Sequence, residues 1–565
     1  MRATVPGRFL SLARTLGLAA VAGGLLVASF PPNGLPVCAV LAMAPLHAAL
    51  ALGPRPVRLG ERVLAGAVVG LWVGLAGAAW MHGTLVRFAG LSWGLAALGH
   101  LAFALYVAVP YTLAAVAWGG LRPLSPWRRA AGAGLVLAAV EALFPTAVGY
   151  RSAVGLGAAP AWIQAAEVGG VGLVTAWQTA AGALLAEATV AFTRRRRLAA
   201  GALGAALVLW LAAARGFGAW RIQAVEAALA RAPAVRVGLV QPGFGAGSTG
   251  DPAAAMALLR ALSDRAARAG AALVVWPESA YPFAIVQPWR PPSEGPRAPY
   301  GALPRPTILA TTTYREGDPY PENRAFVVDP NAGLVASYAK ANLLPFGERI
   351  PLVDPAWGEA HLPGAQHYRP GPGPGVFELS GAAGRVRLAP LICYEDTIPR
   401  YAASAARRGI DAFVNLTNDS WFGATAAPWQ HQALAVFRAV EARRPMVRVV
   451  AAGPSSLVDP AGRIVARTDL SLPRGGRPAV PAVRVVDLPR LEGGGLPLGF
   501  YARYAPWVDG ALAAWALWLW AAGVRRSGGL RWRRRGRGRS PGAGGETRPP
   551  GSRSGDHARP SGSVA

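Results

Sequence analysis

Lysine is almost absent from this chain, and charge of either sign is scarce. Lys340 is the single lysine among 57 basic residues, and charged residues make up 15% of the 565 positions. Soluble proteins carry roughly 25% charged residues. Hydrophobic residues reach 53% here, so the composition argues against one large soluble core and indicates helices that cross a membrane.

Cysteine and histidine patterns typical of disulfides or metal sites are also missing. Cys38 lies in an apolar stretch and Cys393, the second of the two cysteines, lies in an expected strand of another domain. The seven histidines form no HxxxH or HExxH pair. We therefore expect no disulfide, no metal and no other cofactor.

The net charge of +28 does not indicate a nucleic-acid partner, because the arginines gather in two other settings. Eleven lie between Arg525 and Arg559, in a segment rich in glycine, proline and serine that is typical of a disordered tail. Others flank apolar stretches, where they orient a membrane protein. We expect residues 525–565 to form a disordered cytoplasmic tail that contacts anionic lipid.

Eight apolar stretches approach the length of about 20 residues that a membrane-spanning helix needs. They cover residues 12–30, 35–53, 63–80, 91–119, 130–144, 165–192, 198–214 and 507–524. The first follows Arg2 and Arg8, as a signal peptide would, but it has no clear cleavage site and further spans follow directly. We interpret it as an anchor.

The arginines between these stretches indicate how the chain is oriented. With a cytoplasmic N-terminus, the cytoplasmic loops hold the arginines at positions 55, 58, 62, 122, 128, 129 and 194–197. The opposite loops hold little, Arg87 in one and Arg151 in the other. This is the positive-inside pattern. A membrane domain of seven spans in residues 1–214 then places residues 215–506 outside the cytoplasm, and the span at 507–524 returns the chain to the inside.

Residues 215–506 have the pattern of an α/β domain. Short β-rich runs recur at residues 236–244, 271–278, 306–314, 324–330, 385–396 and 411–419. Helical stretches fall between several of them, at residues 251–269, 397–409 and 428–444. Apolar strands followed by helices predict a sheet that helices cover. Two Pro/Gly-rich insertions, which carry Trp289, Trp357 and Tyr368, are predicted to be long mobile loops at residues 283–305 and 351–375.

The single lysine stands in an unusual setting. An arginine-biased chain keeps lysine where a compact ammonium is needed, because an ammonium makes point-like contacts and shifts its pKa. The alternative is a chance surface lysine. Lys340 lies in YAKANLLPFGERIPL, and this aromatic and apolar run is not typical of a solvated face.

Cys393 and Glu278 each stand at the end of an apolar strand. Cys393 lies in LICYED, with a helix predicted next, and such a turn brings backbone N–H groups that stabilise a thiolate and an oxyanion. A buried structural cysteine is the alternative, which the acids Glu395 and Asp396 disfavour. Glu278 ends the strand AALVVWPE, where active sites of α/β domains gather. With Lys340 they make a candidate nucleophile, acid/base and cation.

These stretches together resemble a known family. WPES at 276–279, Lys340 in YAK followed by PFGE, and Cys393 in LICYED resemble the Glu–Lys–Cys triad of the nitrilase superfamily. Within that superfamily, the chain resembles the bacterial apolipoprotein N-acyltransferases. Its N-terminal spans and its C-terminal span carry this closer resemblance, together with three stretches: NLTNDSWFG at 415–423, PWQHQALAVFRAVEARRPMVR at 428–448 and DPAGRIV at 459–465. The resemblance covers nearly the whole chain except the arginine tail.

The resemblance implies a fold and a location. The fold is a multi-span α-helical membrane domain with a nitrilase-like αββα sandwich as its catalytic domain. The location is the inner membrane, crossed several times, with the catalytic domain on the periplasmic side.

The resemblance also implies a ping-pong reaction. Glu278 takes the thiol proton, and Cys393 attacks the sn-1 ester of a phospholipid such as phosphatidylethanolamine. The acyl chain is held as a thioester until the amine of a lipoprotein's diacylglyceryl-cysteine takes it. Lys340 stabilises the oxyanion. The implied partners are a phospholipid donor, a diacylated apolipoprotein acceptor and the membrane.

Other residues match the family or depart from it. Glu348, Tyr394 and Glu395 match positions that support the site. Where the family has Asn-Thr-Gly or Asn-Asn-Gly, this chain has Ala451-Ala452-Gly453, and Gly250 falls about where a tryptophan near the lipid is usual. These departures bear on substrate positioning and not on the triad.

Five polar or aromatic residues are expected to have structural roles. His431 and Trp429 are expected to pack at a helix start under the site. The other three, which we expect to fix a loop through side-chain to backbone hydrogen bonds, are Asn415, Asn418 and Asp419. The alternative for these three is a place in the lining of the pocket.

Two other functions stay open at this point. One is a membrane-tethered amidase or nitrile hydrolase that uses the same triad on a small C–N substrate. The other is a non-catalytic membrane protein. Trp289 and Trp357 on long loops, and eight spans where one would tether the domain, favour a lipid substrate.

Overall fold

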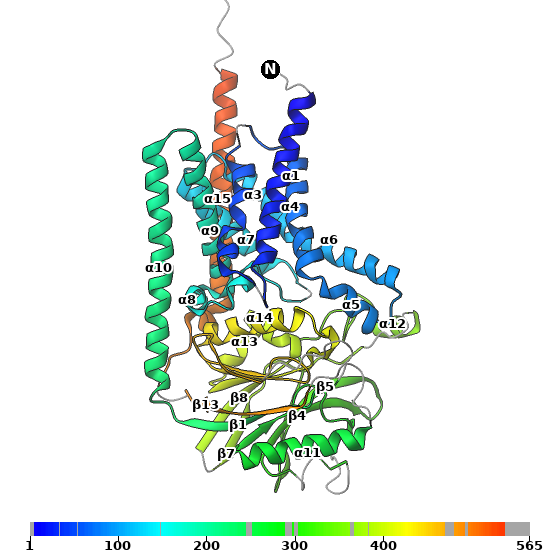
Figure 1. Ribbon diagram of the computed structural model, residues 1–565. Helices are drawn as coiled ribbons and strands as arrows, with labels where there is room; N and C mark the ends of the chain where they lie inside the picture. The colour runs from blue at the N-terminus through cyan, green and yellow to red at the C-terminus, as the bar shows by residue number, and fades with distance from the viewer. Residues whose placement is uncertain are drawn as a thin grey trace, which may run out of the picture.

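A bundle of helices and an α/β domain lie end to end in this protein (Figure 1). The computed structural model describes residues 5–536 except for residues 33, 54, 147, 245–250, 289–296, 299–302, 362–366, 382–383, 469–479 and 492–494. Gly250, Trp289 and residues 537–565, which carry three of the expectations above, lie outside the described residues.

Each of the eight apolar stretches forms helix. The bundle contains α1 Val5–Ala28, α2 Pro36–Leu41, α3 Met43–Ala51, α4 Leu59–Leu71, the π-helical turn η1 Trp72–Gly77, α5 Trp80–Arg87, α6 Trp93–Leu121, α7 Pro126–Leu143, the 3-10 turn η2 Ser152–Leu156, α8 Pro160–Ile163, α9 Ala166–Thr193, α10 Arg197–Leu229 and α15 Phe500–Gly536. Within the described residues, six helices are long and apolar enough to cross a membrane. The stretches expected at 35–53 and 130–144 form the shorter helices Pro36–Ala51 and α7.

Two expected boundaries are wrong, because helices continue past the end of the apolar run. α10 extends to Leu229 and not to residue 214. Its last turns are held by packing, since Val225 and Ala228 contact the α/β domain at Leu491. α15 likewise continues to Gly536, so the segment after residue 524 begins as helix. Arginine is a good helix former, which accounts for this extension.

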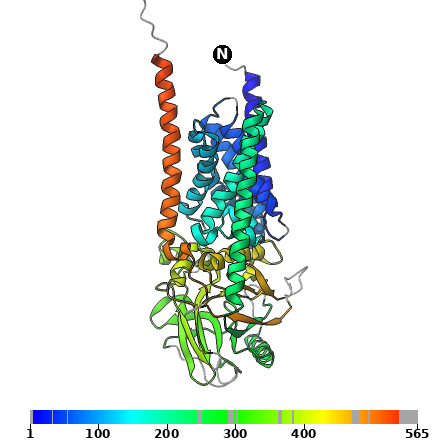
Figure 2. The same cartoon turned by 90° about the vertical axis from the view of Figure 1, so that its left-hand side faces the viewer.

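Both described ends of the chain lie at the same end of the bundle, opposite the α/β domain (Figures 1 and 2). This arrangement agrees with an odd number of crossings before the α/β domain and one crossing after it. The side of the membrane that each end faces stays a prediction.

The α/β domain contains two sheets. The first has the strand order β13-β1-β2-β4-β5-β6, with β3 beside β4, and the second has the order β12-β11-β10-β9-β8-β7. The strands are β1 Ala234–Gln241, β2 Leu273–Val275, β3 Ile285–Val286, β4 Thr307–Arg315, β5 Asp318–Asp329, β6 Gly333–Ala339, β7 Phe377–Gly381, β8 Gly384–Ile392, β9 Ala412–Thr417, β10 Met446–Val450, β11 Ser456–Val458, β12 Ile464–Arg467 and β13 Ala482–Pro489.

The sheets pack face to face and helices cover their outer faces. Alternate residues of central strands, such as Val237 and Leu388, meet in the core between the sheets. Residues of the opposite parity pack under α11 Pro252–Arg268 on the first sheet. On the second sheet they pack under α13 Pro399–Ala406 and α14 Ala427–Ala442, which also face the bundle (Figure 1). This αββα sandwich confirms the predicted fold class.

The two Pro/Gly-rich insertions are not wholly irregular. The first contains β3, which pairs with β4, and the second contains α12 Pro355–His361. Elements of two and seven residues carry too little periodicity to be recognised in a sequence. Trp357 is half exposed on α12, and the backbone N–H of Tyr368 donates to the carbonyl of Glu348 at 2.8 Å.

A partly buried ion pair fastens the α/β domain to the bundle. Glu167 on α9 accepts a hydrogen bond at 2.6 Å from Arg443, just after α14, and others at 2.7 Å from Arg221 on α10. Arg443 also donates to Gln164 at 2.7 Å. These contacts tie the end of α14 to the membrane helices.

Candidate active site

Cys393 begins a 3-10 turn, η3 Cys393–Thr397, directly after β8. Its φ is +52°, a left-handed conformation that costs a non-glycine residue about 1–3 kcal/mol. The surroundings hold it there: Glu395 accepts from the backbone N–H of Ile392 at 2.8 Å, and Asn415 donates to the carbonyl of Cys393 at 3.2 Å. The turn presents a half-buried thiol at the end of the strand.

Glu278 follows β2 at the same edge of the sandwich and is 6% exposed. One carboxylate oxygen accepts from the Asn323 side chain at 2.8 Å, and the other accepts from the backbone N–H of Asn418 at 3.0 Å. Its charge acts on the nearby Cys393 thiol and raises the pKa of that thiol. It is therefore held in place to exchange a proton with that thiol.

Lys340 follows β6 and is 1% exposed. Its Nζ donates to Glu348 at 2.8 Å and to Glu278 at 3.4 Å. The fold thus brings Glu278, Lys340 and Cys393 together from the ends of three strands. Their catalytic roles stay predictions.

The burial of these groups determines their protonation. Burial raises the pKa of Glu278, and burial together with the Glu278 charge raises the pKa of Cys393 well above its ordinary value. Burial alone would lower the pKa of Lys340, but Glu348 and Glu278 outweigh it and raise that pKa. The lysine is therefore a fixed cation, and the thiol keeps its proton until a base removes it.

Asn323 is a member of the site that the sequence did not indicate. Its Nδ2 donates both to Glu278 at 2.8 Å and to Glu348 at 3.1 Å, so it links the two carboxylates that share Lys340. It lies in β5 of the first sheet, whereas Cys393 follows β8 of the second sheet. The surrounding letters PENRAF form no pattern that distinguishes a site residue from an ordinary strand asparagine.

The three residues expected to support the site occupy different places. Glu348 pairs with Lys340 and accepts from the backbone N–H of Leu344 at 2.8 Å. Glu395 is fully buried and accepts from the hydroxyl of Tyr338 at 2.7 Å, so it ties the nucleophile turn to the lysine segment. A carboxylate that only accepts holds backbone in place and does not stabilise an oxyanion. The Tyr394 hydroxyl donates to the carbonyl of Thr146 in the bundle at 3.2 Å.

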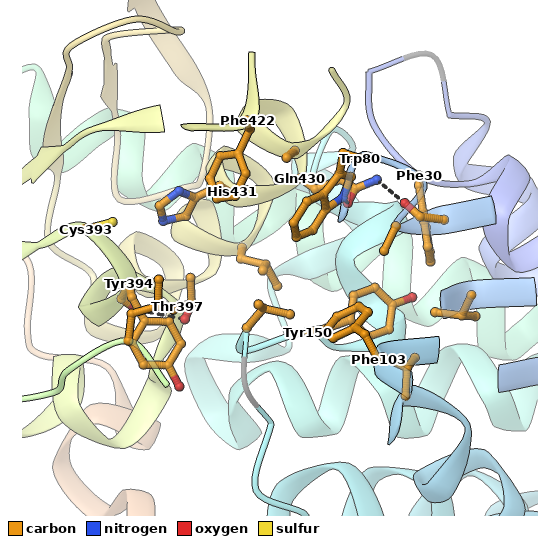
Figure 3. A pocket seen from close by; sticks show the side chains of 18 residues that line it. Phe30, Trp80, Phe103, Tyr150, Cys393, Tyr394, Thr397, Phe422, Gln430 and His431 are labelled. Carbon is orange, nitrogen blue, oxygen red and sulfur yellow. Dashed lines mark hydrogen bonds between the residues drawn. The ribbon is translucent and has the colours of Figure 1, made fainter. Parts of the chain in front are cut away.

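An apolar cavity extends from Cys393 into the bundle (Figure 3). About 750 Å³ of space between the atoms lies in and in front of it, with the open solvent at its mouth included. The bundle contributes Phe30, Val73, Gly77, Ala78, Trp80, Phe103, Val107, Val148 and Tyr150. The α/β domain contributes Leu344, Cys393, Tyr394, Thr397, Phe422, Ala427, Gln430, His431 and Leu434.

Hydrogen bonds across the two domains form one wall of this cavity. Gln430 on α14 accepts from the Trp80 indole at 3.0 Å and donates to the carbonyl of Gly77 at 2.9 Å. The Trp80 ring meets Phe422 edge to face, with ring centroids 5.1 Å apart. Neither domain alone makes the cavity.

The residues expected to be structural include one that faces the cavity. Asn418 fixes its loop by accepting from the backbone N–H of Ser420 at 3.2 Å, as expected. Trp429 packs under the Arg467 guanidinium, 5.3 Å from the ring centroid. His431, however, lines the cavity and contacts two carboxylates (Figure 3). Across the described residues, no cluster of three or more His, Cys, Asp and Glu side chains is arranged to hold a metal ion.

Comparisons with known proteins agree with this two-domain site. Residues 236–471 match the carbon-nitrogen hydrolase family, and residues 22–184 match the apolipoprotein N-acyltransferase N-terminal domain. The α/β domain is therefore similar to the carbon-nitrogen hydrolases, and the helical bundle is similar to the N-terminal domain of apolipoprotein N-acyltransferases. These two matches confirm the resemblance drawn from the triad motifs.

Curated apolipoprotein N-acyltransferases are similar to the chain over part of their length. An apolipoprotein N-acyltransferase of Bradyrhizobium diazoefficiens is 33% identical over 53% of this chain and 58% of its own. One of Azotobacter vinelandii is 35% identical over 43% of this chain and 45% of its own, and apolipoprotein N-acyltransferase 2 of Treponema pallidum is 31% identical over 47% of each. The chain spans about half the length of the curated relatives it matches.

Solved structures similar to the chain come from the nitrilase superfamily. An amidase from Nesterenkonia is 20% identical with a TM-score of 0.31, covering 46% of this chain and 92% of that one. A nitrilase-superfamily protein of Saccharomyces cerevisiae is 19% identical with a TM-score of 0.33, covering 45% and 90%.

Two alanines stand where the family pattern has asparagine followed by threonine or asparagine. Ala451 and Ala452 are buried after β10, where the backbone N–H of Ala451 donates to the carbonyl of Thr417 at 3.0 Å and its carbonyl accepts from Gly243 at 2.9 Å. The alanines therefore pack between strand ends of the two sheets. They do not line the cavity beside Cys393.

Proposed function

We propose that this protein transfers a fatty acyl chain from a phospholipid, through a thioester on Cys393, to the N-terminal amine of diacylglyceryl-cysteine in an apolipoprotein. The observation that carries the proposal is the position of the thiol: it opens into an apolar cavity, and half of the residues that line this cavity come from the helical bundle. A small soluble C–N substrate does not need such a cavity. A fatty acyl chain bound beside the thiol does need an apolar cavity that shields it from water.

The first half-reaction would form the acyl-enzyme. Glu278 takes the Cys393 proton as the sulfur attacks the carbonyl carbon of the sn-1 ester, and the carbonyl oxygen becomes an oxyanion. The Lys340 ammonium stabilises that charge, a contribution of about 3–4 kcal/mol for a single donor elsewhere. When the oxyanion collapses, the glycerol oxygen leaves with the proton from Glu278. The products are a thioester and a lysophospholipid.

The second half-reaction would release the acyl chain to the acceptor. The neutral α-amine of diacylglyceryl-cysteine attacks the thioester carbonyl, and Lys340 again faces the oxyanion. Glu278 takes a proton from the attacking nitrogen and returns it to the leaving sulfur. An amide bond forms, the C–S bond breaks, and the free thiol is regenerated.

The proposed location is the inner membrane, with the α/β domain on the periplasmic side. The positive-inside pattern and the apolar helices support it. Both substrates are lipids, so a site at the membrane surface spares the transfer of either lipid into water.

Acyl transfer in detergent tests the proposal. Wild-type protein is given phosphatidylethanolamine and a diacylated lipopeptide with a free amine, and the peptide mass is followed. We expect an N-acylated lipopeptide and a lysophospholipid in equal amounts, and none with the Cys393→Ser variant. Hydrolysis of small amides without transfer to the lipopeptide would contradict the proposal and favour an amidase.

A further inference from the structure

His431 lies inside a closed network of four buried charged groups. Its Nε2 is 2.8 Å from Asp396 Oδ1, and its Nδ1 is 2.8 Å from Asp419 Oδ1. Arg448 on β10 contacts the second oxygen of each aspartate, at 3.4 Å for Asp396 and 2.9 Å for Asp419. Both aspartates and the arginine are fully buried, and the His431 side chain is 10% exposed.

The two aspartates belong to the two segments that position the chemistry. Asp396 lies in η3, three residues after Cys393. Asp419 begins the 3-10 turn η4 Asp419–Phe422, one residue after Asn418, whose backbone N–H holds Glu278 at 3.0 Å. His431 therefore bridges the segment that carries the thiol and the segment that holds the proposed base.

The geometry requires a charged imidazole. Each ring nitrogen faces a carboxylate oxygen at hydrogen-bond distance, so both nitrogens must donate, and only the imidazolium has two donors. Burial by itself would lower the pKa of His431, but Asp396 and Asp419 outweigh it and raise the pKa to about 9. Two cations then balance two carboxylates, and the network is neutral.

We propose that His431 is a positioning residue that sets the thiol against its base and keeps negative charge away from the thiol. The charged groups that face it are Asp396 from η3, Asp419 from η4 and Arg448 from β10. The Asp419 charge already raises the pKa of the Cys393 thiol. Loss of the imidazolium leaves the network with one net negative charge, so the thiol gives up its proton less readily, and the turn loses the contact between Asp396 and His431.

The first test does not depend on the acyltransferase function. In a Cys38→Ser background, Cys393 is the only cysteine, and its alkylation by iodoacetamide is measured against pH in detergent. We expect the midpoint of the rate profile to lie about one pH unit higher in His431→Gln than in the parent, the size of effect that one added charge produces in a protein environment. An unchanged midpoint would overturn the inference.

Two further variants separate charge from packing. Gln432→Met alters the next residue of α14, which donates to Ser456 at 2.8 Å and touches none of the four charges, and its midpoint should match the parent. His431→Lys keeps the cation and should lie within a few tenths of a unit of the parent. A full-unit shift in His431→Lys, or an equal shift in Gln432→Met, would mean that the alkylation reports packing alone and would contradict the proposal. If His431→Gln does not fold, His431→Lys decides the question.

The second test rests on the proposed function. With vesicles of phosphatidylethanolamine as donor, His431→Gln should form acyl-enzyme at least tenfold more slowly at pH 7, with an unchanged half-saturating lipid concentration. The parent should lose rate above pH of about 9, and the variant should lack this decline. If His431→Gln instead raised the half-saturating lipid concentration and kept the full maximal rate, His431 would be a lipid contact, and its positioning role would be overturned. If no protein is acylated, the proposed function fails and the alkylation profile still decides the role of His431.

Discussion

At the scale of single residues, the site is a pair of carboxylates that share one ammonium beside a thiol. Lys340 reaches both Glu278 and Glu348 from a position that is 1% exposed. A guanidinium is planar and larger and cannot make the same point contact. This explains why the chain keeps a lysine at position 340, although the remaining 56 of its 57 Lys and Arg residues are arginine.

The Lys340→Arg variant tests this requirement. We expect the charge to be kept and the protein to fold, but acyl-enzyme formation to fall by roughly a hundredfold or more, because the cation no longer faces the oxyanion. Lys340→Met leaves two buried carboxylates without a cation and should lower the free energy of unfolding by about 3–5 kcal/mol. Mass spectrometry of Cys393 and thermal unfolding in detergent measure the two effects. A rate near wild type in Lys340→Arg would show that any cation suffices.

The pH dependence of the first step follows from Glu278. Burial raises its pKa, so on acidification it gains a proton at a higher pH than an exposed glutamate, whose pKa is roughly 4.3. The rate of Cys393 alkylation should therefore fall with decreasing pH, with an acid limb above that value. The Glu278→Gln variant should lose this limb and react slowly throughout. The same acid limb in Glu278→Gln would assign it to another group.

How much of the site the sequence could predict depends on where each residue stands. Three site residues end or follow an apolar strand in a short motif: Glu278, Lys340 and Cys393. Their neighbours in the sequence are therefore enough to recognise them. Asn323 and His431 acquire their contacts only when separate elements meet. The sequence placed His431 at a helix start under the site, but it could not show that the ring contacts two carboxylates.

At the scale of elements, the cavity forms where three helices of the bundle meet the α/β domain. η1, α5 and α6 bring apolar side chains to α14 and η4, where Trp80 bonds Gln430. The long periodic helices were predictable from sequence. The turn η1 and the 3-10 turns were not, because four to six residues are too few to show a period.

The α6 wall predicts a chain-length effect. Val107 lines the cavity, whereas Val109 on the same helix is exposed away from it. Val107→Phe should slow acylation by a donor with long acyl chains several-fold more than acylation by a short-chain donor, because the larger ring takes up cavity space. Val109→Phe should affect both donors alike. Equal slowing of both donors by Val107→Phe would show that the acyl chain does not lie against α6.

At the scale of the whole molecule, the helices set the site against a membrane. The first described helix, α1, begins on the side away from the α/β domain, and the last, α15, ends on that same side (Figure 2). The ion pair between Glu167 on α9 and Arg443 at the end of α14 joins the two domains. These two domains together form the cavity that the thiol faces.

A reporter of compartment tests the orientation. Alkaline phosphatase, which is active only outside the cytoplasm, is inserted at Gly317 in the turn between β4 and β5, or fused after residue 536. We expect activity from the insertion and none from the fusion. Equal activity from both would contradict the arrangement of the helices, and activity from the fusion alone would reverse the orientation.

Trapping of the acyl-enzyme tests the central claim most directly. The purified protein is incubated with phosphatidylethanolamine as the only acyl donor and no acceptor, and its peptides are weighed. We predict one acyl group on the peptide that contains Cys393, removed by hydroxylamine and absent from Cys393→Ser. An unmodified Cys393 peptide with intact phospholipid, or an acyl group on another residue, would contradict it.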